Sequence, residues 1–525
     1  MRAFDRPGRS TAYSTSGMAA TSAPMATLAA VECLKAGGNA VDAAVTASAV
    51  LCVVEPAMTG IGGDCFALIG TPDGKVQGLN ASGRSARAAD ADWLRASGLT
   101  RIAPRSIHAI TVPGAIDGWD QLLRAYGTMS LADCLAPAIG MAEAGTPVTP
   151  RVALDWPEDA PDLLADAGGQ QHYLKNGLAP QEGDVIAYPA LARTLRLIAR
   201  EGRDAFYAGP IAADIVGHVR AMGSLLTLAD FSSHTSTWVE PISTGFAGHE
   251  VLEIPPSGQG LTALIALNVV SHFGLARHEP DSPDRMHIEI EAMKLAWELR
   301  NRHIADLDFA EVLVAELLSP GMAARLAGMI DMKQALDIRT AMRQSDTIYL
   351  SVVDRNRLAV SFINSIYYGF GSAIVTPATG ISLQNRGACF VADPGHPNCI
   401  GPAKRPLHTI IPAMSRKDGR VDMSFGVMGG DYQPMGHLCV AVNRYIYGMD
   451  PQAAIDMPRY FPKGGEVLVE SGVTEAAQAG LRDRGHALVP APEPLGGGQA
   501  IVIDHRRGIL IGGSDPRKDG LALGI

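Results

Sequence analysis

The stretch Gln344-Ser-Asp-Thr-Ile-Tyr-Leu-Ser-Val-Val-Asp354 places a strand-like apolar run directly after a threonine. Cleavage of the bond between Asp346 and Thr347 would make that threonine a new N-terminus. Its hydroxyl would then be a nucleophile, and its own α-amine, with a reference pKa of about 7.7–8.0, would be the base. Threonine is also common in ordinary strands, so this interpretation depends on the sequence around it.

A second β-rich run follows closely. Residues 358–365, Leu-Ala-Val-Ser-Phe-Ile-Asn-Ser, are separated from the first run by the short polar turn 354–357. Two such runs joined by a short turn predict a hairpin, with Thr347 at the start of its first strand. The polar segment 331–345 before it is expected to be flexible, because a bond that is to be cleaved must be accessible.

Helical patterns dominate the first part of the chain. A helix is predicted over 24–36, and Asn39 is placed to cap a second helix that continues through Val54. From about 106 to 330 the apolar spacing is mostly helical, with 283–304 as the clearest example. These patterns predict a protein in which helices precede and surround the strands.

Glycine-rich blocks follow the hairpin in a specific order. They are Gly369-Phe-Gly-Ser372, Gly380-Ile-Ser-Leu-Gln-Asn-Arg-Gly387, Pro394-Gly-His-Pro-Asn398, Gly401-Pro-Ala-Lys-Arg-Pro406 and Gly426-Val-Met-Gly-Gly-Asp431. Two earlier blocks, 37–44 and 55–64, and the ending Gly513-Ser-Asp-Pro-Arg517 complete the set. In this order and spacing, the chain resembles the γ-glutamyltransferase (glutathione hydrolase) family of N-terminal nucleophile hydrolases over nearly its whole length.

The resemblance implies a fold and a maturation step. The implied fold is α+β, a four-layer αββα sandwich with two central antiparallel sheets between helical layers. In the family, the threonine attacks the preceding carbonyl and splits the precursor. Here this would give an α subunit of residues 1–346 and a β subunit of residues 347–525, which together form one folded domain. Such αβ units are compatible with a larger homo-oligomer.

The resemblance also assigns catalytic roles. Ser365 stands where the family has a hydroxyl residue that orients the amine of the nucleophile. Gly429 and Gly430 match the pair whose backbone N–H groups form the oxyanion hole, where glycine allows a close approach of the substrate. Water would then hydrolyse the acyl-enzyme. Taken alone, the two glycines would also suit an ordinary turn.

The implied substrate pocket departs from the pattern of glutathione-cleaving members, so the chain resembles a divergent branch. Cys389 stands where those members have the acidic residue that holds the glutamyl α-amine, and Arg386 replaces a glutamine. Tyr367 replaces an asparagine, and the arginine that clamps the α-carboxylate is expected at Arg84. The predicted substrate-binding residues are Arg84, Tyr367, Gln384, Arg386, Cys389, His408, Thr409 and Asp431.

These replacements make the predicted pocket less acidic and more basic. Arg84 and Arg386 could each bind a carboxylate through two parallel hydrogen bonds, or could instead pair with a carboxylate of the protein. His408 could line the pocket or be an ordinary core histidine. The segment 391–400 is shorter than the loop that covers the pocket in glutathione-type members, which predicts a more open pocket.

Three functions remain open at this stage. The family itself favours cleavage or transfer of γ-glutamyl groups from a small amide or peptide. The basic pocket favours an amidohydrolase for a carboxylate-bearing amide without an α-ammonium, such as oxamate, a glutaryl amide or a cephalosporin side chain. A processed, non-catalytic scaffold is the third, and the intact set of Thr347, Ser365, Gly429 and Gly430 disfavours it.

Composition excludes several other classes. With 47% hydrophobic and 19% charged residues, the 525-residue chain is typical of a globular protein. A net charge of −10 disfavours nucleic acid as a partner. The longest apolar stretch near the start, 43–54, is too short to span a bilayer, so no membrane association is expected.

Cysteine use and the start of the chain predict a cytoplasmic protein. The seven cysteines contain no CxxC pair, and the first ten residues contain no apolar signal-peptide core. The 14 histidines form no HExxH or other paired ligand motif. The implied mechanism also needs no metal or organic cofactor, so none is expected.

Overall fold

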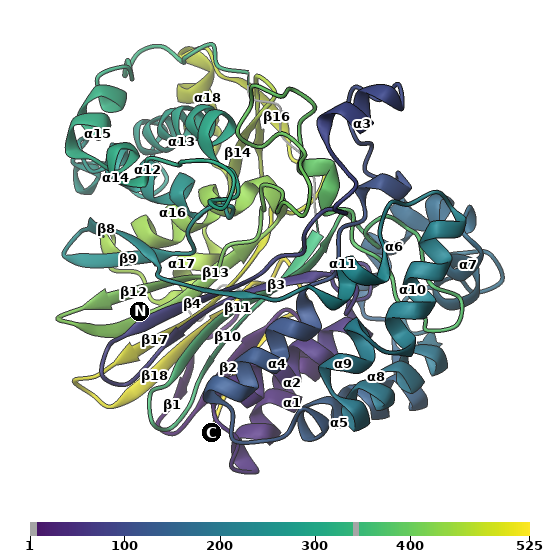
Figure 1. The fold of residues 1–525 in the computed structure, drawn as a ribbon. Helices are drawn as coiled ribbons and strands as arrows, with labels where there is room; N and C mark the ends of the chain where they lie inside the picture. The colour runs from purple at the N-terminus through teal and green to yellow at the C-terminus, as the bar shows by residue number, and fades with distance from the viewer. Residues whose placement is uncertain (1–7, 340–345) are drawn as a thin grey trace.

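The computed structural model describes residues 8–339 and 346–525. Within these ranges, two seven-stranded antiparallel sheets stack on each other (Figure 1). The first sheet has the order β1 (Ala12–Ser14), β18 (Ile509–Ser514), β17 (Gly497–Asp504), β13 (Arg420–Met428), β12 (Ala413–Lys417), β9 (His249–Glu253) and β8 (Ile242–Phe246). The second has the order β19 (Leu521–Gly524), β2 (Met18–Thr21), β10 (Asp346–Val353), β11 (Ala359–Tyr367), β3 (Asp64–Gly70), β4 (Val76–Ala81) and β7 (Thr237–Val239).

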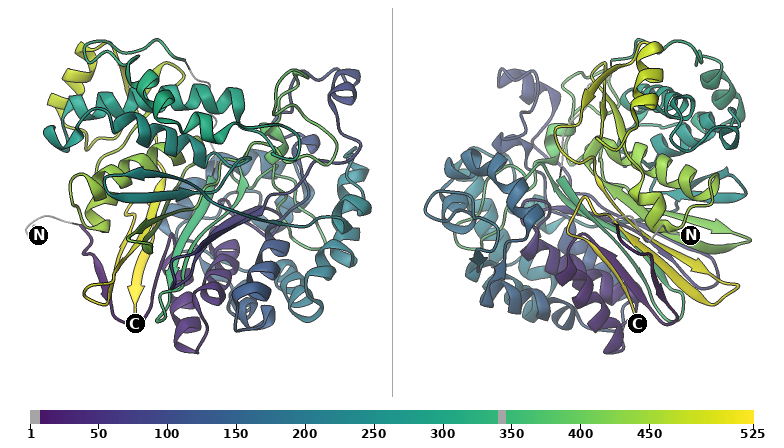
Figure 2. Two further views of the ribbon diagram at one scale, coloured as in Figure 1. Left: turned by 60° about the vertical axis from the view of Figure 1, so that its left-hand side comes forward. Right: turned by 180° about the vertical axis from the view of Figure 1, so that it is seen from behind.

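Helices cover the outer face of each sheet, as the two views of Figure 2 show. One group packs on the second sheet: α1 (Pro24–Lys35), α2 (Ala40–Val54), α4 (Ala115–Tyr126), α5 (Leu131–Ala144), α6 (Pro150–Leu164), α7 (Ala167–Tyr173), α8 (Pro189–Glu201), α9 (Arg203–Tyr207), α10 (Pro210–Ala221) and α11 (Leu228–Ser232). The other group packs on the first sheet: α12 (Gly260–Val270), α13 (Pro283–His303), α14 (Val314–Leu317), α15 (Pro320–Ala327), α16 (Gln433–Tyr445), α17 (Pro451–Asp456) and α18 (Glu475–Asp483).

Smaller elements lie outside these four layers. A three-stranded sheet is formed by β14 (Tyr460–Lys463), β15 (Glu466–Val469) and β16 (Ala487–Pro490), and a two-stranded one by β5 (Thr146–Pro147) and β6 (Val185–Ile186). The short helix α3 (Ala91–Ala96) projects from the body of the molecule (Figure 1). Single 3₁₀ turns are η1 (Ile107–Ala109), η2 (Leu275–Arg277), η3 (Arg386–Cys389) and η4 (Gly430–Tyr432). The predicted α+β sandwich of four αββα layers is confirmed.

The side chains of β10 explain why its sequence is a continuous apolar run. Ile348, Leu350 and Val352 point to the core beneath the helices, whereas Tyr349 and Val353 point to the core between the two sheets. Because successive side chains of a strand point to opposite faces, both faces must be apolar when a sheet is covered on both sides. The first residues of this strand therefore lie at the end of a buried layer.

Local sequence signals position the neighbouring elements as expected. The side chain of Asn39 accepts hydrogen bonds from the backbone at the start of α2, and Asp42 closes the reciprocal bond of a capping box. All 15 residues of α2 are buried, so this helix forms the floor under β10 and β11. The predicted hairpin is confirmed by the antiparallel pairing of β10 with β11.

The predicted cleavage point lies inside the second sheet. Strands that begin at or after Asp346 (β10, β11 and β19) share this sheet with strands from before Thr347 (β2, β3, β4 and β7): β2 lies between β19 and β10, and β11 pairs with β3. The division into residues 1–346 and 347–525 stays a prediction, but both parts share one sheet. Of the segment predicted to be flexible, residues 340–345 lie outside the described residues. Each helix of the described chain is too short or too polar to cross a bilayer.

Candidate active site

Thr347 lies at an irregularity in the hairpin. Asp346 pairs with Tyr367, and Ile348 pairs with Asn364, so a single residue of β10 faces two residues of β11. Such a bulge re-aims a side chain and is frequent next to active sites. Here the Thr347 hydroxyl donates a hydrogen bond to Ser365 Oγ at 3.2 Å, and Thr347 is 1% exposed.

Ser365 connects the predicted nucleophile to a buried arginine. Its Oγ accepts a hydrogen bond from Arg386 Nη2 at 3.3 Å and one from the Tyr367 backbone N–H at 2.9 Å. Arg386 Nη1 donates to Thr409 Oγ1 at 2.8 Å, and the guanidinium lies 4.1 Å from the centre of the Tyr367 ring. Arg386 and Tyr367 are both 0% exposed. A fixed positive charge therefore lies two hydrogen bonds from the Thr347 hydroxyl.

Tyr367 adopts a costly backbone conformation at this point. Its φ is 84°, in the region that favours glycine. A non-glycine residue held there costs on the order of 1–3 kcal/mol and persists where the surroundings require it. The conformation turns the chain out of β11, directly after the bulge, and brings the ring under Arg386.

A buried carboxylate forms the other end of this polar cluster. Asp64 Oδ1 accepts hydrogen bonds from the backbone N–H groups of Gly83 and Gly114 and from Gln384 Nε2, at 2.8–3.0 Å. Its Oδ2 lies 3.1 Å from His408 Nε2. Burial raises the pKa of Asp64 to about 6, although the nearby charge of Arg386 acts in the opposite direction.

His408 is neutral in this setting. Burial, and then the charge of Arg386, hold the pKa of His408 well below its usual range. Its Nδ1 accepts a hydrogen bond from the Ile410 backbone N–H at 3.3 Å, so Nε2 carries the proton and donates it to Asp64. His408 is therefore a partner of Asp64 and, with 0% exposure, is closed off from solvent.

The two glycines of the predicted oxyanion hole follow directly after β13. Gly429 has a φ of 117° and Gly430 a φ of 58°, so both occupy conformations that L side chains rarely adopt. A Cβ on Gly429 would lie 2.9 Å from Gly496 Cα. The carbonyl of Gly430 accepts a hydrogen bond from Gln259 Nε2 at 2.9 Å, which fixes the turn.

Asp431 supports this turn from its other side. Its Oδ1 accepts a hydrogen bond from Arg300 Nη1 at 2.6 Å, and the same Nη1 donates to Gln259 Oε1 at 2.7 Å. Gln259 Nε2 also donates to the Thr409 carbonyl at 2.7 Å. Asp431 is therefore placed to hold the glycine turn, and Gln259 connects that turn to the residues around Arg386.

A cavity of about 80 Å³ opens onto Thr347 and Gly429. Its wall includes three cationic residues that the sequence did not indicate, Arg151, Lys463 and Lys518. None of the eight predicted substrate-binding residues lines it. The cavity next to the proposed nucleophile is thus lined by residues other than the predicted substrate-binding ones.

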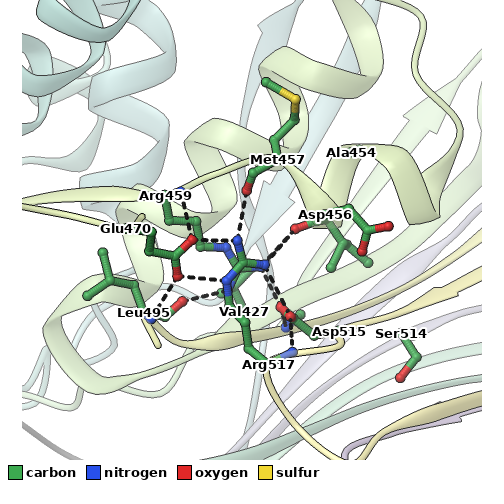
Figure 3. Close-up of polar contacts among 12 residues, drawn as sticks. Val427, Ala454, Asp456, Met457, Arg459, Glu470, Leu495, Ser514, Asp515 and Arg517 are labelled. Carbon is green, nitrogen blue, oxygen red and sulfur yellow. Dashed lines mark hydrogen bonds and ion pairs between the residues drawn. The ribbon is translucent and has the colours of Figure 1, made fainter. Parts of the chain in front are cut away.

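The outer wall of this cavity, formed by residues 492–496, is held by buried ion pairs (Figure 3). Arg517 donates to both oxygens of Glu470 at 2.6 and 2.7 Å, and Arg459 Nη2 donates to Asp515 at 2.5 Å. Arg459 Nη1 also donates to the Leu495 carbonyl at 2.6 Å, while Glu470 accepts from the Leu495 backbone N–H at 3.1 Å. These contacts fix the wall and the segment that precedes Lys518.

Two of the predicted pocket residues, Arg84 and Cys389, lie away from the cavity at Thr347. The Arg84 side chain lies 3.4 Å from Asp308 and from the Thr235 carbonyl, so in this structure it pairs with a carboxylate of the protein, and its role as a carboxylate clamp stays a prediction. Tyr367 and Arg386 fill the space beside Ser365, and the more open pocket expected from the short segment 391–400 stays a prediction. Cys389, at the end of η3, is buried, and its carbonyl accepts a hydrogen bond from Asn398 Nδ2 at 2.8 Å.

Among the residues that the structure describes, three buried side chains outside this site lie close enough together to bind one metal ion: His287, Glu291 and His486. Lys294 Nζ already donates to Glu291 at 2.7 Å, and His287 Nδ1 is hydrogen-bonded to His486 Nε2 at 2.8 Å. An ammonium at this distance repels a second cation. The group is therefore explained as an internal polar network, and none of its members lines the cavity at Thr347.

Comparison with known proteins decides the family. The family model described as Gamma-glutamyltranspeptidase matches residues 26–525. The chain belongs to this family. It is 39% identical over 502 residues to the glutathione hydrolase-like YwrD proenzyme of Bacillus subtilis, covering 94% of this chain and 95% of that protein. It is 36% identical over 527 residues to the oxamate amidohydrolase proenzyme of Klebsiella pneumoniae, covering 97% and 99%.

Solved structures agree with the family. A cephalosporin acylase from Bacillus halodurans superposes with a TM-score of 0.94 at 39% identity, covering 100% of this chain and 99% of that one. A Helicobacter pylori gamma-glutamyltranspeptidase chain superposes with a TM-score of 0.57 at 29% identity, covering 60% and 91%. The predicted family and its hydrolase class are confirmed, and this chain is an enzyme.

Sequence reasoning missed several residues of the site. Asp64 ends a glycine-rich block, and an acidic residue in such a block was a usable signal. Gln259 lies in the turn before α12 and Arg300 lies in α13, and neither belongs to a local motif. The lysines of the cavity wall carry no signal either, because exposed lysines are common in any sequence.

Proposed function

We propose that the chain is a precursor that cleaves its own Asp346–Thr347 bond and then works as an N-terminal threonine amidohydrolase. The contact between the Thr347 hydroxyl and Ser365 Oγ supports this role, as does the position of Gly429 on the same cavity. The relatives named above are both called proenzymes. The products would be subunits of 346 and 525 − 346 = 179 residues, held together by shared sheets.

In the proposed reaction, Thr347 Oγ forms a bond to the carbonyl carbon of the amide. The freed α-amine of Thr347 takes the hydroxyl proton and passes it to the leaving nitrogen as the C–N bond breaks. The N–H groups of Gly429 and Gly430 bind the oxyanion. Water then hydrolyses the ester and restores the threonine. No metal or organic cofactor takes part in these steps.

The proposed acyl donor is a small carboxylate-bearing amide without an α-ammonium. The single observation that carries this proposal is the fully buried guanidinium of Arg386 beside Ser365. A carboxylate would form charge-assisted hydrogen bonds there, whereas an ammonium would be repelled. The space filled by Tyr367 and Arg386 also favours a short acyl group. Oxamate, named for one relative, has these properties.

A γ-glutamyl donor is the second candidate. It is favoured by Asp64, a buried carboxylate in the same cluster that could hold an ammonium if His408 moved aside. The relative at 39% identity is named glutathione hydrolase-like. A cytoplasmic location is also part of the proposal, supported by the seven buried free cysteines. Assembly of αβ units into a homo-oligomer stays a prediction.

A substrate panel tests the proposed donor. Purified enzyme is assayed with oxamate, glutaryl-p-nitroanilide and γ-glutamyl-p-nitroanilide, and kcat/KM is compared. We expect a donor without an ammonium to exceed the γ-glutamyl amide, and Cys389→Asp to move the preference back by adding an anion. Faster cleavage of the γ-glutamyl amide than of both other donors would instead support the second candidate.

A further inference from the structure

We propose that His437 and Glu253 form a buried pair that positions the glycine turn, with His437 holding the backbone N–H of Val427. This inference rests on the proposed function, because it takes Gly429 and Gly430 as the oxyanion hole. It adds two positioning residues outside the predicted catalytic and substrate-binding sets. Neither of them lines the cavity at the proposed nucleophile.

Strand β13 loses one of its two neighbours just before the glycine turn. The pairing of β12 with β13 ends where Ala413 faces Phe425. Val427, two residues further along β13, keeps a partner only on the other side, Gly498 of β17. Residues two apart in a strand direct their backbone groups to the same edge, so the Val427 N–H is directed to the edge that β12 has left. A buried N–H there needs another acceptor.

His437, on α16, supplies that acceptor. Its Nε2 accepts a hydrogen bond from the Val427 N–H at 3.1 Å, and its Nδ1 lies 2.6 Å from Glu253 Oε1. Helix α16 approaches β13 closely at this point, since a Cβ on Gly436 would lie 2.6 Å from Val427 Cγ1. His437 is 1% exposed, and Val427 and Glu253 are 0% exposed. Solvent therefore does not compete for these contacts.

The two hydrogen bonds fix the tautomer of the His437 ring. Because Nε2 accepts from Val427, the single proton of the neutral ring lies on Nδ1, which donates it to Glu253. A second proton on Nε2 would face the Val427 N–H and break the contact. Burial raises the pKa of Glu253, and His437 acts in the opposite direction. Glu253 thus determines which ring nitrogen is left to accept.

The glycine turn is then held on both sides of Gly429. His437 fixes the backbone two residues before it, at Val427, and Gln259 fixes the carbonyl of Gly430 directly after it. An oxyanion donor works only when it already points to the place where the charge develops. Loss of the first hold should therefore displace the Gly429 N–H and weaken binding of the transition state more than binding of the substrate.

Substitutions of His437 that separate hydrogen bonding from packing test this role. His437→Gln places an amide oxygen near the position of Nε2, whereas His437→Leu keeps apolar bulk without an acceptor. His437→Asn keeps a donor for Glu253, but its amide stops short of Val427. We expect kcat to fall at least about tenfold in the leucine and asparagine variants, with KM nearly unchanged, and the glutamine variant to recover most of kcat.

The matched controls are His303→Gln and His303→Leu, on an exposed residue at the end of α13, and both should keep the wild-type kcat. A role in packing alone predicts the reverse order at His437, because leucine suits an apolar core better than glutamine does. A lower kcat in His437→Gln than in His437→Leu, or equal values in all four proteins with histidine, glutamine, leucine or asparagine at this position, would overturn the proposal.

Hydrogen exchange provides a readout that needs no turnover. In the single-chain Thr347→Ala protein, the peptide that contains Val427 and Gly429 should stay protected with histidine or glutamine at position 437. It should exchange at least about tenfold faster with leucine or asparagine there. Equal exchange in all four proteins would overturn the proposal. A wild type that shows this exchange order but hydrolyses no amide would contradict only the proposed function, because the exchange order itself supports the hold of His437 on the turn.

Discussion

The guanidinium of Arg386 donates a hydrogen bond to Ser365 Oγ, and the same oxygen accepts a hydrogen bond from the Thr347 hydroxyl. A buried cation is thereby coupled to the nucleophile through one shared oxygen. A nearby positive charge favours the neutral form of an amine, because it repels the ammonium. In the mature enzyme, Arg386 is therefore expected to help keep the new α-amine of Thr347 unprotonated and ready to act as a base.

This relationship predicts a pH shift. In wild type, kcat should rise with pH as the α-amine of Thr347 loses its proton, and the charge of Arg386 should lower the pKa of this step. Arg386→Met removes the charge, so the acidic limb of the kcat profile should move to higher pH. Arg386→Lys keeps the charge and should leave the limb nearly in place. Coincident profiles for wild type and Arg386→Met would contradict the electrostatic role.

Arg386 and Arg84 should differ in their effect on substrate binding. Arg386→Lys keeps the charge but loses the planar fork, so kcat/KM for a carboxylate-bearing amide should fall at least about tenfold. Arg84 lies against Asp308, so Arg84→Ala should change kcat/KM less than about threefold, as expected for an exposed ion pair. A loss at Arg84 as large as that at Arg386 would restore Arg84 as the carboxylate clamp.

Maturation is tested by the size of the product. Wild type should give fragments of 346 and 179 residues on a denaturing gel, with the smaller beginning Thr-Ile-Tyr-Leu. Thr347→Ala removes the nucleophile, so it should remain a single chain of 525 residues without amidase activity. Full activity in an uncut protein would end the assignment of Thr347.

The oxyanion hole is tested at Gly429. A side chain there is strained at a φ of 117° and approaches Gly496, so Gly429→Ala should displace the N–H groups. Loss of one such donor costs roughly 100- to 1,000-fold in turnover. Gly508→Ala is the control, since Gly508 has a φ of 71° but open space around it. Unchanged kcat in Gly429→Ala would show that the turn is only structural.

Glu55 should make stability depend on pH. Burial raises its pKa from 4.5 to about 7, so between these values the folded chain keeps a proton that the unfolded chain releases. Stability from this group should therefore fall as pH rises through this range, by up to roughly 3 kcal/mol. Denaturant unfolding of the single-chain Thr347→Ala protein at pH 5 and pH 8 should show this decrease.

Glu55→Gln should weaken that pH dependence, because a neutral amide replaces the buried acid that Ser22 contacts at 2.6 Å. Glu279→Gln, on an exposed residue, is the matched control and should leave the dependence unchanged. An identical decrease in Glu55→Gln and in the control would assign the effect to other groups.

Much of the fold was accessible from short stretches of sequence. The hairpin of β10 and β11 could be predicted because two β-rich runs and the short polar turn between them are neighbours in the sequence. The cap at Asn39 was predicted for the same reason, since its hydrogen bonds are local. The blocks around Thr347 then indicated the family, which the family model confirmed.

The fold and the proposed nucleophile, Thr347, could be predicted from the order of the sequence blocks and their resemblance to a known family. The charges around Thr347 could not, because they come from distant parts of the chain. The sequence indicated that Arg386 and Arg84 could each bind a carboxylate of the substrate. In the structure, Arg386 is buried beside Ser365, whereas Arg84 forms an ion pair with Asp308. Lys463 and Lys518 meet at one cavity from separate parts of the chain. Contacts between residues far apart in the sequence depend on how distant elements pack, and a pattern of neighbouring residues contains no information about that packing.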